Sequence, residues 1–155
     1  MNKIIHRTGT TAFLMAALVT SAFAQNSAHF KDADKVWSHV TGAMVSFDKV
    51  VKAKKWKQVH EAAFEVRDQA LLLPDASKAL AKDKIAKVKE HLKEIQKVAG
   101  ELDEAGDANN GKLVTSLASK LHVHVNMIPM LYPKGALSMK AAMHDAPKKG
   151  HHDHK

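Results

Sequence analysis

The sequence contains no cysteine, and this absence narrows the chemistry open to the chain. Without thiols the protein can form no disulfide, no thiolate metal site and no C-x-x-C-H attachment of c-type haem. The chain also lacks a glycine-rich phosphate loop and the apolar–polar alternation that is typical of strands. No Ser-His-Asp arrangement or catalytic carboxylate pair stands out from the surface charge, so we expect that the protein is not an enzyme.

Long apolar runs are also scarce, and the first one belongs to an expected targeting segment. Two basic residues precede the short apolar run 12–19, and the small-x-small motif 22–24 stands directly before Gln25. The run is shorter than the roughly 20 residues that span a bilayer, and no later run reaches that length. We therefore predict a signal peptide at residues 1–24, a periplasmic mature protein and no membrane insertion after cleavage.

The charge is strongly positive, with a formal net charge of +8 from 24 basic and 16 acidic residues. Such an excess often indicates a nucleic-acid partner. Here the lysines are spread among acids rather than clustered with aromatics, which make up only 5% of the chain. Together with the expected export, this favours a solvated helical surface and no nucleic-acid partner.

Four stretches place apolar residues alternately three and four positions apart, which predicts four amphipathic helices. The first runs over 28–54 and the second over 56–73, and the apolar stripes of the third and fourth span 85–102 and 114–128. The expected core positions are Val36, Val40, Ala43, Phe47, Val50, Trp56, Val59, Ala63, Val66, Ala70, Leu73, Ile85, Val88, Leu92, Ile95, Ala99, Leu102, Val114, Leu117, Leu121, His124 and Ile128.

The connections between these helices are short. Pro74 is expected to end the second helix, and Asp75 or Ser77 can cap the third. A polar turn at 106–111 separates the third helix from the fourth. Short connections join neighbouring helices of opposite direction, so we predict an all-α fold, an antiparallel up-down-up-down four-helix bundle.

Beyond Tyr132 the helical pattern dissolves into Pro, Gly, Lys and His. We therefore place the bundle domain at 25–132 and a flexible His- and Met-containing tail at 133–155. A histidine-rich tract of this kind binds divalent ions weakly and without geometric selectivity, while a purely solubilising tail is the alternative. The tail histidines considered as metal ligands are His144, His151, His152 and His154.

Two segments carry a resemblance to known proteins. Residues 59–68 read VHEAAFEVRD and residues 102–108 read LDEAGDA. Over 36–120 the chain resembles a loosely defined group of small exported helical proteins of bacteria that accompany heavy-metal efflux systems. The resemblance implies metal handling and an efflux component as a partner; it assigns no ligand set, and His60 is a matching position without a role.

An interior layer of histidines is the first candidate metal site. His124 occupies a core position where Leu or Ile is expected, and a buried imidazole must find partners. Counting 1.5 Å per residue from the helix ends brings His39 and His91 to about the height of His124. Three imidazoles with one open position suit zinc and related divalent ions. The alternative is that His124 bonds a neighbouring group or reaches solvent.

Methionines extend the candidate site along the fourth helix. Met127 and Met130 follow His124 at spacings of three, and thioether with imidazole favours Cu(I). The alternative assigns Met127 to the core and Met130 to the surface.

These ligands indicate a periplasmic metal-binding accessory protein that buffers or carries copper, or else nickel, cobalt or zinc, for an efflux system. One alternative is a structural or partner-binding helical module in which the histidines have no metal role. The other is a noncovalent haem protein of the cytochrome b562 type, with His39 and His124 as its axial pair.

Overall fold

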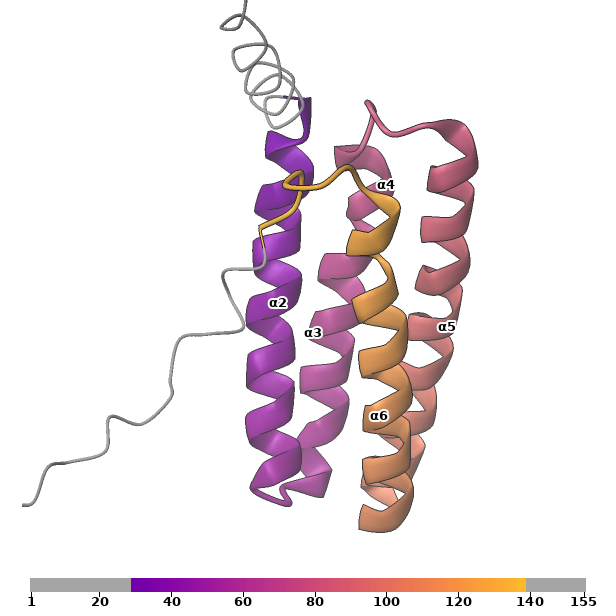
Figure 1. The fold of residues 1–155 in the computed structure, drawn as a ribbon. Coiled ribbons are helices and arrows are strands. Elements are labelled where there is room, and N and C mark those ends of the chain that lie inside the picture. Colours follow the sequence, from indigo (N-terminus) through magenta and orange to yellow (C-terminus); the bar gives the residue numbers. More distant parts are fainter. Residues whose placement is uncertain (1–28, 139–155) are drawn as a thin grey trace, which may run out of the picture.

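The computed structural model describes residues 29–138, which form helices and no strand (Figure 1). The elements are α2 (Lys31–Lys52), η1 (Trp56–Gln58), α3 (Val59–Leu71), α4 (Leu73–Ala76), α5 (Lys82–Asp107), α6 (Gly111–Met127) and η2 (Pro129–Leu131). The all-α prediction is confirmed. Within the described residues, no helix has both the length and the apolar character needed to cross a membrane. The predicted signal peptide at 1–24 lies outside this part of the chain.

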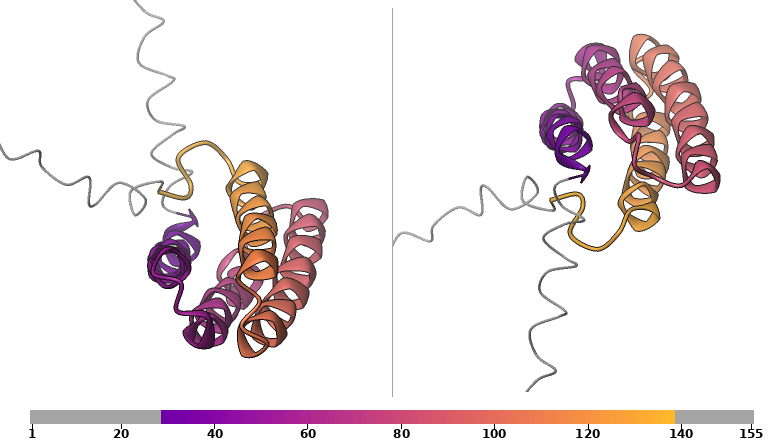
Figure 2. Two further views of the ribbon diagram at one scale, coloured as in Figure 1. Left: turned by 90° about the horizontal axis from the view of Figure 1, so that it is seen from below. Right: turned by 90° about the horizontal axis from the view of Figure 1, so that it is seen from above.

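The four long helices pack in the order of the sequence. α2 packs against α3, α3 against α5, and α5 against α6, whereas α2 and α6 share little contact. The views along the bundle show the same order, with α2 further from α6 than from α3 (Figure 2). The α2–α6 side is therefore the least tightly packed side of the protein.

The apolar stripes read from the sequence form the core. Every expected position from Val59 to Leu73 is fully buried, as are Val88, Ile95 and Leu102 on α5. Burying each such Val, Leu or Ile stabilises the fold by about 1.5–3 kcal/mol. On α2 the buried face differs slightly from the prediction, because Trp37 is buried while Val36 is only half-buried.

Two predicted helix boundaries are wrong. Pro74 does not end a helix but stands in the first turn of α4, where its missing N–H needs no helical partner. α5 continues through Gly106 to Asp107, so the turn expected at 106–111 is confined to 108–110. There the Asn110 side chain caps α6 by accepting a hydrogen bond from the Leu113 N–H at 3.1 Å.

Ser77 is not a helix cap. α5 follows Ala81 without a side-chain cap, and Ser77 is fully buried with its hydroxyl 2.6 Å from the hydroxyl of Tyr132. Burial raises the pKa of Tyr132, and the hydrogen bond with Ser77 lowers it to a smaller extent. This buried hydrogen bond joins the residue that follows η2 to the connection between α4 and α5.

The packed domain extends beyond the predicted boundary at Tyr132. Ala136 and Leu137 are buried, and the Ser138 N–H donates to the Asp34 carboxylate on α2. The Tyr132 ring also meets the Phe30 ring edge-on, with centroids 5.8 Å apart. Residues 133–138 therefore belong to the packed part of the protein and not to a flexible tail, because two of them are buried and Ser138 bonds α2.

Candidate metal centre

His91 on α5 and His124 on α6 face each other. Their Nδ1 atoms are 3.3 Å apart, and the ring centroids are 5.6 Å apart with the planes tilted by 50°. Both side chains are half-buried. The structure thus brings these two of the three histidines of the expected layer together.

The separation of the two nitrogens is compatible with two kinds of interaction. One neutral ring can donate to the other, since an imidazole carries both a donor and an acceptor nitrogen. Alternatively, two nitrogens bound to one tetrahedral or trigonal ion by bonds of about 2.0–2.1 Å lie about 3.3–3.6 Å apart. The two Nδ1 atoms therefore already have the separation that binding to one ion requires, and the helices need not move.

His39 does not join this pair. Its side chain is exposed on α2, although the neighbouring Val40 is fully buried. Within residues 29–138, the one group of three or more His, Asp or Glu side chains with mutually close ligand atoms is His60, Asp103 and Asp107. The expected three-histidine layer is thus reduced to two members. The haem alternative loses its inward-facing His39 ligand for the same reason.

The two methionines lie at the surface near the end of α6. Met127 is 40% exposed and Met130, in η2, is 72% exposed. Met127 follows His124 by one helical turn on the same side of α6. The Met127 thioether therefore belongs to the helical turn that follows His124. The tail ligands His144, His151, His152 and His154 lie outside the described residues.

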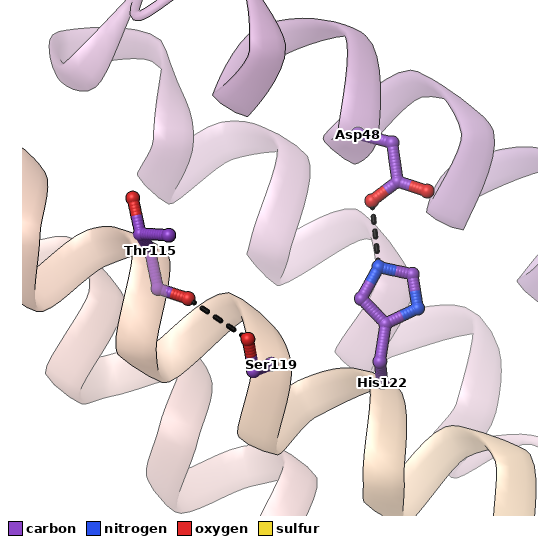
Figure 3. Close-up of polar contacts among 4 residues, drawn as sticks. All are labelled: Asp48, Thr115, Ser119 and His122. Atoms are coloured by element: carbon purple, nitrogen blue, oxygen red, sulfur yellow. Dashed lines mark hydrogen bonds and ion pairs between the residues drawn. The ribbon is translucent and has the colours of Figure 1, made fainter.

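The side chains of His122 and His124 point to different sides of α6. Its Nε2 lies 2.7 Å from the Asp48 carboxylate of α2 (Figure 3), whereas His124 faces α5. Residues two apart on a helix point in nearly opposite directions, which accounts for the division. The His122–Asp48 pair bridges the loosely packed α2–α6 side. At 40% and 51% side-chain exposure, such a polar contact contributes about 0–1 kcal/mol.

The sequence did not predict the His122–Asp48 bridge, since no local pattern links residues on the first and last helices. Nor did it predict the grouping of His60 with Asp103 and Asp107, although both resemblance segments contained these positions. The useful signal was the spacing of four between the two aspartates, which places them on one face near the end of their helix.

Comparison with known proteins finds no family model that matches the chain, and no characterised protein or solved structure that is significantly similar to it.

Proposed function

We propose that this protein is a periplasmic metal-binding accessory protein that buffers or carries copper, or another late first-row ion, for an efflux system. The observation that carries the proposal is the 3.3 Å separation of Nδ1 of His91 from Nδ1 of His124. We take the scaffold to be an antiparallel up-down-up-down bundle, which is supported by the short connections and the sequential packing of the helices.

The donor set favours copper within this proposal. Two imidazole nitrogens and the thioether of Met127, one turn further along α6, would make a mixed nitrogen–sulfur donor set, and soft thioethers favour Cu(I). The chain has no cysteine to compete for the ion. Half-exposed rings leave a path for the ion to enter and leave, as a carrier or buffer requires.

Thermal denaturation with and without Cu(I) tests the proposal. An ion that binds only the folded state at a free concentration of 100 times its Kd stabilises that state by about 2.7 kcal/mol. His124→Leu should lose this stabilisation, because one chelating nitrogen is gone. His122→Leu is the matched control, since it removes an imidazole two residues away that faces Asp48 instead.

A second candidate function, a structural or partner-binding module, is favoured by one feature of the same pair. The spacing of 3.3 Å also suits a hydrogen bond between the two rings. In that case His124→Leu completes the apolar stripe of α6 and leaves any effect of copper on the melting temperature unchanged. Equal copper responses in the His124→Leu and His122→Leu proteins would favour this alternative.

A further inference from the structure

One imidazole and two carboxylates form a separate cluster between α3 and α5. His60, Asp103 and Asp107 each offer a ligand atom, and these atoms all lie within 4.8 Å of one another. Asp103 and Asp107 are one turn apart on the same face of α5, and His60 is the second residue of α3. An ion about 2.1 Å from each ligand separates its ligands by about 3.0–4.2 Å. Small side-chain rotations are therefore enough to bring all three onto one ion.

The backbone approaches closely at the level of this cluster. A Cβ atom on Gly106 would lie 2.6 Å from the carbonyl oxygen of Trp56 and 3.7 Å from Cβ of Val59. Only glycine allows this approach, because it carries no side chain. Gly106 lies between the two aspartates in the sequence, and Val59 directly precedes His60. The close contact thus sets the distance between the imidazole and the carboxylates.

The two aspartates occupy an electrostatically unfavourable place. They stand near the C-terminus of a 26-residue helix, the end that carries a partial negative charge and favours cations. The last turn of α5 contains no basic residue, and the ion pairs found within residues 29–138 do not include Asp103 or Asp107. Residues 101–107 contain four acids and no base in a chain with a net charge of +8. A bound cation would relieve this local repulsion.

The third ligand is held in place by an aromatic contact. The His60 ring lies edge-on to the Phe64 ring one turn further along α3, with centroids 6.3 Å apart. The guanidinium of Arg67 lies 4.1 Å from the centroid of Phe64 and covers that ring. His60 and Asp103 are both half-buried. The imidazole is therefore packed at its position and not a freely moving surface side chain.

We propose that His60, Asp103 and Asp107 bind a divalent cation, in a second metal site that goes beyond the copper function proposed for His91 and His124. One nitrogen and two oxygen donors suit zinc, cobalt, nickel or manganese rather than Cu(I). The two carboxylates balance the charge of a divalent ion, and three protein ligands leave coordination positions for water or exchange. Asp103 is 12 residues from His91 along α5, about 18 Å, so the two sites are independent.

Cobalt titration of the full-length chain tests this site, with Co²⁺ alone as the probe. The variants are Asp107→Asn and its matched control Glu104→Gln, an exposed acid in the same segment that lies outside the cluster. Without metal, both variants should melt slightly higher, since each removes a negative charge near the C-terminus of α5. With Co²⁺, the control should keep the melting-temperature increase of the parent protein, whereas Asp107→Asn should lose it. Cobalt affinity should fall at least about tenfold in Asp107→Asn, because loss of a ligand weakens binding no less than loss of an outer-shell partner.

Two further variants make the result decisive. His60→Gln should lose the same cobalt response, and circular dichroism checks that each variant remains helical. The series is repeated with His124→Leu in every protein, so that failure of the copper proposal leaves this test intact. If Asp107→Asn and Glu104→Gln respond equally to cobalt in the His124→Leu series, the cluster is a solvated acidic surface and the proposal is overturned.

Discussion

Two glycines of α5 offer the same substitution in opposite surroundings. A Cβ on Gly100 would meet no atom within 4 Å, whereas a Cβ on Gly106 would lie 2.6 Å from the Trp56 carbonyl oxygen. That distance is about 0.8 Å short of ordinary van der Waals contact at 3.4 Å. The atom in the way belongs to the backbone of η1, so no side-chain rotation can relieve the clash. η1, which leads directly into α3, must therefore move away from α5.

The two substitutions should therefore change the free energy of unfolding by different amounts. Gly→Ala inside a helix gains about 1 kcal/mol of helix propensity, and this is the expected effect of Gly100→Ala. Gly106→Ala gains the same propensity but adds an overpacking cost of about 1–3 kcal/mol. The difference between the two variants therefore isolates the clash at about 1–3 kcal/mol, since the effect on the unfolded chain is common to both.

Urea denaturation measures both free energies of unfolding. Gly100→Ala should unfold at a higher urea concentration than the parent protein, and Gly106→Ala at a clearly lower concentration than Gly100→Ala. Gly106→Ala should also weaken cobalt binding, because the shift separates His60 from the aspartates of α5. Equal stabilisation by the two substitutions would refute the close approach at Trp56 and with it the geometry of the cluster.

Three other outcomes are expected. Because burial raises the pKa of Tyr132, its contribution to stability should be complete below about pH 10 and be lost as the pH rises further. Tyr132→Phe should remove this alkaline loss while costing about 1–2 kcal/mol at neutral pH, since the buried Ser77 hydroxyl loses its partner; melting curves at several pH values measure both effects. Deleting 139–155 should leave the melting temperature nearly unchanged, whereas deleting 134–155 should lower it by several degrees through loss of two buried apolar side chains. Mass spectrometry of the exported protein should find Gln25 as the first residue, and retention of the preceding residues would refute the predicted signal peptide.

Apolar spacing predicted most of the core because it depends on local periodicity alone. It could not fix the rotation of α2, where Val36 and Trp37 are both apolar and tertiary packing selects the tryptophan. Periodicity also says nothing about how the chain passes through Pro74. A proline at a helix end and one in a first turn look alike in sequence, and only the geometry of the α3–α4 connection separates them.

The rise of 1.5 Å per residue along each helix predicted one contact between histidines correctly and another wrongly. His91 and His124 lie on helices joined by one short turn, so the error in their relative height is small and their contact was predictable. His39 belongs to α2, whose rotation the count does not determine, and it faces solvent. The grouping of His60 with Asp107 depends on the register of α3 against α5. That register is set by the close approach at Gly106, which leaves no periodic signal in the sequence.

The most direct test of the central claim is a Cu(I) titration of the full-length protein followed through the ¹⁵N resonances of its histidine rings. Nitrogens that bind the metal change their chemical shift strongly, and diamagnetic Cu(I) leaves the spectra readable. We predict that the Nδ1 resonances of His91 and His124 change together and reach saturation at one equivalent, while those of His39 and His122 stay in place. If the first equivalent shifts other histidines and leaves the His91–His124 pair unchanged, the pair is a hydrogen bond between two rings, and the metal-binding function proposed for it is wrong.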